Sequence, residues 1–273
     1  MRVLPLVALV LFLQDFSIDR RQPVAVTNRD VAVREVTFPG PAGEPIEATL
    51  VAPATPGPHP AVLFVHWYGP EHTNSNRTQY VPDALMLARQ GITSMLVDTP
   101  WSEPSWFRQR DPGRDVAFST DMVKRLRRAV DVLASLEGVD ATRLALVGHD
   151  FGAMYGAVAA SLEPRISAFA FVAGTSRFAD WYTLGRKLDA EQKAAVYRDL
   201  APFDPVAHLP KLTARAVLLQ FARKDPYVSQ EAADALTEAV QAPKEAKSYD
   251  TGHEMNRAAL DDRVAWLVRV LGR

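Results

Sequence analysis

The sequence predicts an α/β protein with a mostly parallel sheet of about eight strands, covered by helices on both faces. Short apolar runs alternate with segments of helical spacing along most of the 273 residues. The runs at residues 61–65 and 144–147 are continuously apolar, as expected of strands that are buried on both faces of a parallel sheet. Polar or glycine-containing turns follow these runs, so we expect reactive groups at the carboxyl ends of the strands.

The first half of the chain opens with a hairpin and continues as alternating strands and helices. A Pro/Gly turn cluster at residues 39–43 separates two β-rich segments, and a proline-rich loop at 53–60 precedes the first buried strand. Apolar residues recur at helical spacing in two later segments. The predicted elements are strands at 31–38, 46–52, 61–65 and 91–97, and helices at 77–89 and 115–136.

The second half continues the alternation around one interruption. Residues 175–212 break the rhythm with aromatic and charged side chains, and we interpret them as a short lid. No internal repeat divides the chain, so we expect a single domain over residues 28–273. The remaining predicted elements are strands at 166–172, 216–221 and 246–249, and helices at 230–240 and 256–271.

Composition restricts the partners of the protein. With 31 basic and 32 acidic residues the net charge is -1, which gives no electrostatic footprint for nucleic acid or anionic lipid. A small-molecule substrate is therefore the expectation. The chain has no cysteine, so it forms no disulfide and has no thiolate ligand or nucleophile. No spacing of His, Asp and Glu suggests a metal site, and we expect no cofactor.

Residues 1–14 begin with Met1-Arg2 and an apolar run from Val3 to Leu13. The run has the charge and length of a short signal peptide, although no clear small-x-small cleavage site follows it. It is too short to form a stable membrane span. A signal peptide would make the protein secreted or periplasmic, whereas an apolar segment packed on the domain would fit a cytoplasmic protein, and both interpretations stay open.

The central motif of the chain is Gly148-His149-Asp150-Phe151-Gly152, between an apolar strand and a helix that starts with small residues. This is the spacing of the nucleophile elbow G-x-S-x-G, with aspartate in the place of serine. The glycines suit a sharp turn at which a larger neighbour would clash. The simpler alternative for Asp150 is a helix N-cap.

Three further motifs accompany the elbow. They are His66-Trp67-Tyr68-Gly69 after the third strand, Asp225 after a later strand, and Thr251-Gly252-His253-Glu254. Nucleophile, acid and histidine in this order resemble the α/β-hydrolase superfamily, and the likeness covers nearly the whole chain. The body of the chain is similar to dienelactone hydrolases and related esterases. The elbow, with its aspartate, instead resembles that of epoxide hydrolases and, more loosely, of haloalkane dehalogenases.

The resemblance implies a role for each motif. Asp150 would be the nucleophile, His253 the general base, and Asp225 the group that orients His253 and stabilises its imidazolium. The backbone N–H groups of Phe151 and Trp67 would form the oxyanion hole. For Asp225 the alternative is a turn residue before a proline, and for His253 a loop residue at the start of the final helix.

The aspartate changes the expected chemistry. A carboxylate is ionised at neutral pH and needs no base to act as a nucleophile. Its attack on an ester would form a reactive mixed anhydride, whereas attack on an alkyl carbon bearing a halide or an epoxide oxygen would form an ordinary ester. Water activated by His253 could then hydrolyse that ester. The aspartate therefore favours displacement at an alkyl carbon.

Three hypotheses follow for the function. The first is a hydrolase that forms an aspartyl-enzyme ester with an epoxide, halide or related alkyl substrate. The second is an esterase or lactonase of dienelactone hydrolase type, in which Asp150 and His253 act together on water. The third is a catalytically silent protein that binds a small ligand, because a fold does not guarantee a function. The sequence gives no indication of the oligomeric state.

Aromatic residues near strand ends and in the lid are candidates for the pocket wall, with ordinary packing as the alternative. They are Tyr68, Trp101, Trp106, Phe107, Trp181 and Tyr182. Together with Tyr197, Tyr182 is also a candidate proton donor for the epoxide reaction.

Three polar residues near the motifs have weaker assignments. We expect His66 to support the loop below the oxyanion hole and His149 to point away from the reacting centre. Asp98 is either a turn anchor, a polar pocket group or an alternative partner of His253.

Overall fold

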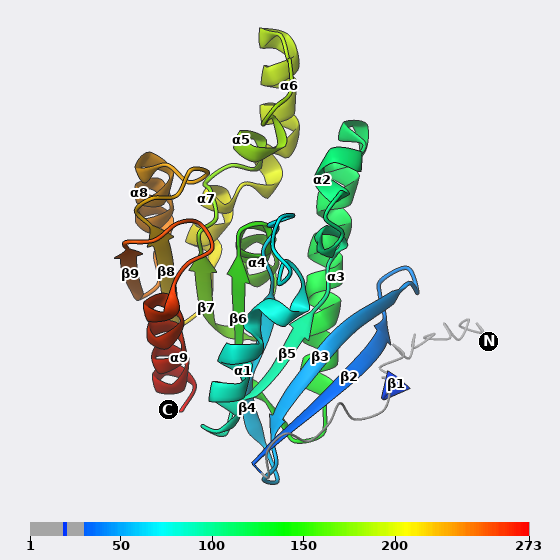
Figure 1. The fold of residues 1–273 in the computed structure, drawn as a ribbon, viewed down its shortest axis with the longest axis vertical. Coiled ribbons are helices and arrows are strands. Elements are labelled where there is room, and N and C mark those ends of the chain that lie inside the picture. Colours follow the sequence, from blue (N-terminus) through cyan, green and yellow to red (C-terminus); the bar gives the residue numbers. More distant parts are fainter. Residues whose placement is uncertain (1–18, 21–29, 273) are drawn as a thin grey trace, which may run out of the picture.

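A sheet of nine strands runs through the part of the molecule that the structure describes (Figure 1). The structure is a computed structural model that describes residues 19–20 and 30–272, so the predicted segment 1–14 and residues 28–29 lie outside it. The strand order is β1-β2-β3-β5-β4-β6-β7-β8-β9. The strands are β1 (Asp19–Arg20), β2 (Val31–Pro39), β3 (Pro45–Pro53), β4 (His59–Val65), β5 (Thr93–Val97), β6 (Val139–His149), β7 (Ile166–Val172), β8 (Ala216–Ala222) and β9 (Lys244–Tyr249).

The predicted fold class is confirmed by this sheet. β2 and β3 form the antiparallel opening hairpin, β3 joins β5 antiparallel, and β5, β4 and β6 through β9 are parallel. The eight strands from β2 to β9 correspond to those expected from the sequence, and the two-residue β1 pairs with β2. The apolar run of β4 is buried on both faces, as the parallel arrangement requires.

Helices cover both faces of the sheet. α1 and α9 pack with one cluster of buried residues, and α3, α4 and α8 pack with the other. The helices are α1 (Val81–Ala88), α2 (Trp106–Gln109), α3 (Asp115–Ser135), α4 (Phe151–Ser161), α5 (Phe178–Tyr182), α6 (Ala190–Leu200), α7 (Pro205–His208), α8 (Gln230–Ala239) and α9 (Arg257–Leu271). Short 3₁₀ turns are at Arg77–Tyr80, Pro100–Ser102, Pro112–Arg114, Ala201–Phe203 and Leu209–Lys211.

Several predicted elements have different limits in the structure, and two of these differences have a clear physical reason. The helix predicted at 77–89 is a 3₁₀ turn followed by α1, with Pro82 in the first turn of α1, where its missing N–H is tolerated. β9 begins at Lys244, two residues before the predicted strand, because this edge strand is largely exposed and has no apolar pattern at its start.

The segment between β7 and β8 contains α5, α6 and α7 and lies beyond the carboxyl ends of the central strands (Figure 1). α6 projects from the body, while α5 is buried against it. The segment includes residues 175–212, which we interpret as a lid from their sequence, and their role as a lid stays a prediction. Within the described residues, no helix has both the length and the apolar character needed to cross a bilayer.

Candidate active site

The elbow places Asp150 on a strained turn between β6 and α4. Asp150 has φ 59° and ψ -124°, a conformation that a non-glycine residue adopts only at a cost of about 1–3 kcal/mol. A Cβ at Gly148 would overlap the backbone of Gly152, and a Cβ at Gly152 would overlap the carbonyl of Val65. The side chain of Asp150 accepts from the N–H of Phe151, the first residue of α4, whereas a simple N-cap accepts from the second or third residue and needs no positive φ.

Asp150, His253 and Asp225 come together at the carboxyl ends of the strands. The Nδ1 of His253 donates to Oδ2 of Asp225 at 2.8 Å, and its Nε2 faces Oδ2 of Asp150 at 3.4 Å. Asp225 follows β8, and His253 lies between β9 and α9. All three side chains are buried, so water screens their charges little. The predicted alternative partner, Asp98, does not contact His253 and instead binds Arg77.

The two backbone donors of the site face the carboxylate of Asp150. The N–H of Phe151 donates to Oδ1, and the N–H of Tyr68 donates to Oδ2 at 3.2 Å. The prediction that Trp67 supplies the second donor is wrong in this structure, because its N–H donates to Oε1 of Gln79 at 2.9 Å. The donor pair is therefore Phe151 and Tyr68, and both N–H groups are already bound to the side chain of residue 150.

Electrostatics hold His253 in its charged form. Burial alone would lower its pKa, but hydrogen bonds to Asp150 and Asp225 outweigh burial and raise the pKa to about 9. Burial also raises the pKa of Asp150, while His253 and the backbone donors lower it. With a pKa of about 9, His253 is protonated at neutral pH, and it lies between Asp150 and Asp225.

A hydrogen-bonded chain connects the loop after β4 to the loop that carries His253. Gln79, which accepts from Trp67, donates through Nε2 to Nδ1 of His149 at 2.6 Å, and Nε2 of His149 donates to the carbonyl oxygen of His253 at 2.9 Å. The ring of His149 stacks on Trp67 with centroids 5.2 Å apart. Burial lowers the pKa of His149 well below its usual value, so this ring is neutral. As expected, His149 supports the site and does not face the reacting centre.

A pocket of about 400 Å³ opens above Asp150. Three of the predicted wall residues, Tyr68, Phe107 and Trp181, line it. Sequence reasoning missed Tyr227, which is 56% exposed and whose ring lies 5.1 Å from that of His253. Because Tyr227 lies two residues after Asp225, the sequence could have indicated that its side chain is close to the site. The size and the mainly apolar wall suit a small organic molecule.

The other three predicted wall residues do not line this pocket. Trp101 is fully buried and its Nε1 donates to the carbonyl of His66, so it belongs to the core. Trp106 lines a separate hollow beside α3. Tyr182 is fully buried, and its hydroxyl bonds that of Tyr155 at 2.6 Å. The sequence does not separate these positions, since an aromatic residue near a strand end or in the segment between β7 and β8 can face either the core or the cavity.

The remaining candidates have structural partners. His66 is fully buried, with Nδ1 against the carbonyl of Trp67 and Nε2 against the hydroxyl of Thr99, which agrees with a supporting role. The hydroxyl of Tyr197 donates to Asp180 at 2.7 Å. Neither Tyr182 nor Tyr197 lines the pocket, so the proton donor expected for an epoxide reaction does not come from these two tyrosines.

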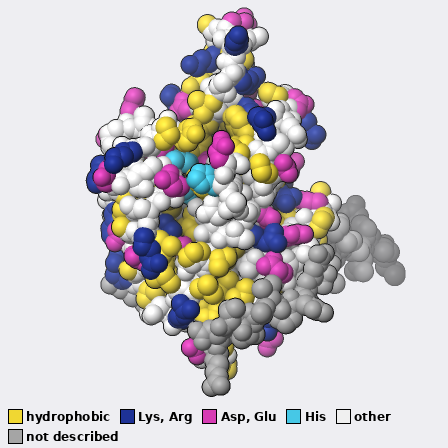
Figure 2. All heavy atoms as spheres, in the orientation of Figure 1, with side chains coloured by type: hydrophobic (Ala, Val, Ile, Leu, Met, Phe, Trp, Pro, Cys, Tyr) yellow, Lys and Arg dark blue, Asp and Glu magenta, His cyan; other side chains and the backbone are white. Residues whose placement is uncertain are grey.

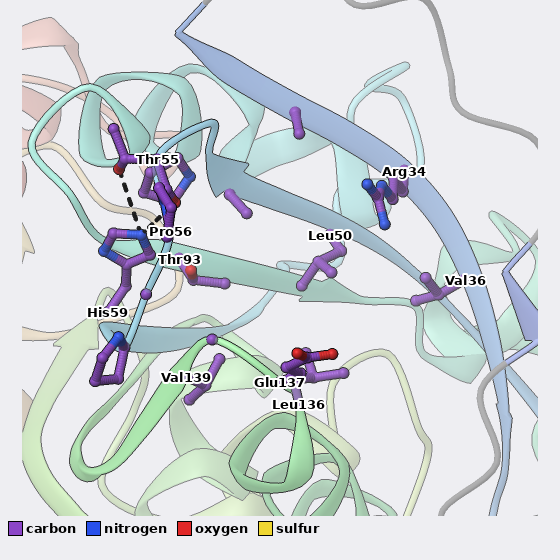
Figure 3. A pocket seen from close by; sticks show the side chains of 16 residues that line it. Arg34, Val36, Leu50, Thr55, Pro56, His59, Thr93, Leu136, Glu137 and Val139 are labelled. Atoms are coloured by element: carbon purple, nitrogen blue, oxygen red, sulfur yellow. Dashed lines mark hydrogen bonds between the residues drawn. The ribbon is translucent and has the colours of Figure 1, made fainter.

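A larger cavity of about 540 Å³ lies away from the site, beside β2, β3 and the start of β4 (Figure 3). His59 is its single lining histidine and bonds the carbonyl of Thr55 at 2.9 Å. The hydroxyl of Thr55 also lies 3.5 Å from Nε2 of His59, but the shorter bond to the carbonyl of Thr55 already occupies this nitrogen. Across the described part of the chain, no three His, Asp or Glu side chains converge in a way that could hold a metal ion.

Comparison with known proteins supports the fold. No family model matches the chain. A curated relative, the 2,6-dihydropseudooxynicotine hydrolase of Paenarthrobacter nicotinovorans, is 29% identical over 139 residues, which is 51% of this chain and 35% of that protein. The match thus spans about a third of the length of this relative.

Solved structures are similar over most of the chain. An acetyl xylan esterase from Paenibacillus sp. R4 has a TM-score of 0.78 at 20% identity, covering 93% of this chain and 88% of that one. The 2,6-dihydroxy-pseudo-oxynicotine hydrolase has a TM-score of 0.68 at 19% identity, covering 87% and 67%. A protein assigned as a dienelactone hydrolase from Klebsiella pneumoniae has a TM-score of 0.63 at 19% identity, covering 89% and 99%.

These likenesses agree with the resemblance of the body to esterases and dienelactone hydrolases. The likeness of the elbow to epoxide hydrolases stays a prediction. The similar solved structures, the strand order, the strained elbow and the histidine before the last helix together identify the chain as a protein of the α/β-hydrolase fold.

Proposed function

We propose that the protein is a hydrolase of a small organic substrate, with Asp150, His253 and Asp225 as its reacting groups. The observation that carries the proposal is the position of the Asp150 carboxylate. It lies on a strained elbow, faces the imidazole of His253 at 3.4 Å and accepts from two backbone N–H groups. Strain of this kind persists where the surrounding structure enforces it, most often at functional sites.

The geometry of the donors favours a covalent aspartyl ester. In an esterase that uses serine, such N–H groups are open to the oxygen of the substrate carbonyl. Here they bind the oxygens of Asp150, so they are placed to stabilise an oxyanion that forms on Asp150 itself. That oxyanion arises when water attacks an ester of Asp150. The substrate would be an epoxide, a halide or another compound with an electrophilic alkyl carbon.

The reaction would have two half-reactions, formation of the Asp150 ester and its hydrolysis, and the charge of Asp150 would differ between them. An oxygen of Asp150 attacks the alkyl carbon as the bond to the leaving group breaks, and the resulting ester is neutral. Loss of this charge removes one of the two carboxylates that hold the pKa of His253 near 9. His253 can then give its proton to the alkoxide of an opened epoxide, or to solvent when the leaving group is a halide, and take a proton from the attacking water as its base. Collapse of the oxyanion expels the alcohol, which takes that proton from His253, and the proton of the new carboxyl group returns to His253 as the carboxylate is restored.

A second candidate is an esterase or lactonase, and the solved structures favour it. Similar structures include acetyl xylan esterases, although their identity of 20% or less supports only the fold. In this candidate Asp150 and His253 would activate a water molecule for direct attack on the substrate carbonyl. The difficulty is the oxyanion hole, whose N–H groups are bound to Asp150.

A substrate panel followed by isotope labelling separates these candidates. The panel contains epoxides, haloalkanes, esters and lactones, and the best substrate is then turned over once in heavy-oxygen water. Under the covalent mechanism the label enters the peptide with Asp150, while the peptide with Asp225 stays unlabelled as an internal control. Label in the product alone, with full activity on esters, would favour the esterase. Retention of most activity by Asp150→Ala would exclude both mechanisms, and tight ligand binding without turnover would indicate a binding protein.

A further inference from the structure

Negative charge predominates among the described residues that line the pocket above Asp150. They include the carboxylates of Glu71, Asp150 and Glu254 but no lysine or arginine, and the imidazolium of His253 at the base offsets part of this charge. Figure 2 shows acidic side chains beside the histidines at the opening, with the basic side chains of this face farther out. Arg108 acts electrostatically on Tyr68 but does not line the cavity. A charged substrate therefore meets a negative field as it enters.

The two carboxylates at the mouth are free to act on a ligand. Glu71 and Glu254 are both exposed, and neither has an ion pair or a side-chain hydrogen bond with any residue in the described part of the chain. By contrast, the buried Glu163 is neutralised by Arg165 at 2.6 Å. The charge at the mouth is therefore not cancelled by a neighbouring cation of the protein.

The walls of the cavity are suited to an organic cation. Trp67, Trp181 and Tyr227 place their rings 6.1, 6.0 and 5.1 Å from the ring of His253, so aromatic groups already surround the imidazolium. Aromatic faces attract cations through their quadrupole, and ammonium groups are common ligands of such cages. This observation is independent of the carboxylates and points to the same class of ligand.

We propose that the pocket selects substrates that carry an organic ammonium group and disfavours substrates that carry a carboxylate. The ammonium group lies near Glu71 and Glu254, and the reactive carbon lies near Asp150. The inference rests on the proposed function only in taking this cavity as the substrate site. It concerns recognition, and it holds whichever bond is cleaved.

The test measures binding without turnover, so its result does not depend on the reaction. The probes are phenyltrimethylammonium, its uncharged isostere tert-butylbenzene, and benzoate, added to the full chain and followed by quenching of tryptophan fluorescence. The variants are Glu71→Gln, Glu254→Gln and their double variant. Glu238→Gln removes an exposed carboxylate that does not line the pocket and is the matched control.

We expect the cation to bind about tenfold more tightly than its isostere, and benzoate to bind more weakly than either. Each glutamate at the mouth should contribute a factor of about two to five to the preference for the cation over the isostere, as expected for one partly screened charge within about 8 Å. High salt should reduce this preference. Glu238→Gln should change nothing. Equal binding of cation and isostere, or an unchanged preference in the double variant, would overturn the proposal. Loss of the preference in these variants with no hydrolysis of any substrate would leave the recognition intact and reject the proposed reaction.

Discussion

Replacing Asp150 with asparagine should lower the pKa of His253 by about two to three units. His253 lies 3.4 Å from Asp150 and 2.8 Å from Asp225, and together these carboxylates raise its pKa to about 9. Two unit charges about 4 Å apart interact by about 4 kcal/mol at an effective dielectric constant of about 20, and about 1.36 kcal/mol corresponds to one pKa unit. Asparagine keeps the shape of the side chain and removes its charge, so the pKa of His253 should fall toward its usual value.

The assay is a titration of the imidazole signals by nuclear magnetic resonance between pH 5 and pH 10. The chain has six histidines, and loss of one signal in His253→Gln assigns the resonance. Asp98→Asn is the control, because Asp98 faces His66 at 3.4 Å and has no contact with His253. A shift below half a unit in Asp150→Asn would refute the reasoning. The charge change proposed between the two half-reactions would then have no basis.

Three further predictions concern stability and geometry. Gly148→Ala should prevent folding or destabilise the protein by several kcal/mol, because the new Cβ would overlap the backbone at residue 152, and denaturant unfolding measures this. Gln79→Leu should lower the free energy of unfolding by about 1–3 kcal/mol and reduce kcat/KM, because it removes the acceptor of the Trp67 N–H. The free energy of unfolding should fall by about 2–3 kcal/mol between pH 6.5 and pH 9. The folded-state pKa of His253, about 9, lies above its unfolded value of about 6.5, so this stabilisation is full below pH 6.5 and is lost as the pH rises through 9.

Each of these predictions has a control or a contradicting outcome. Gly113→Ala meets only the flexible side chain of Asp111, at 3.3 Å, and should fold normally. If the free energy of unfolding of Gln79→Leu falls by no more than about 0.5 kcal/mol and the variant keeps full activity, the hydrogen bonds of Gln79 do not position the site. His253→Gln should flatten the dependence of stability on pH above pH 6.5. An equal slope in that variant would assign the titration to another group.

The fold was predictable because buried strands and helices have characteristic apolar patterns in the sequence. The strand at residues 166–172 has the same limits in the prediction and the structure, since an apolar run between polar turns marks a buried strand. The grouping of Asp150, Asp225 and His253 was also predictable, because each follows a strand of one parallel sheet. Their catalytic roles stay predictions.

Details of the site depend on tertiary contacts that the local sequence does not encode. Trp67 and Tyr68 are adjacent, and which N–H faces Asp150 depends on Gln79, which binds the first of them from twelve residues away. Likewise, the core position of Trp101 depends on its contacts with the carbonyl of His66 and the ring of Tyr155. Neither partner is near Trp101 in the sequence.

The occupied donors have a consequence for inhibition. The carboxylate of Asp150 is a covalently attached anion, bound at the two N–H groups that would otherwise receive a free one. A tethered group competes at an effective concentration far above the millimolar level of most metabolites. Acetate, halide or other small anions released in solution should therefore be poor inhibitors at these donors. An anionic product of the proposed hydrolysis would therefore compete poorly with the side chain of Asp150 for these two donors.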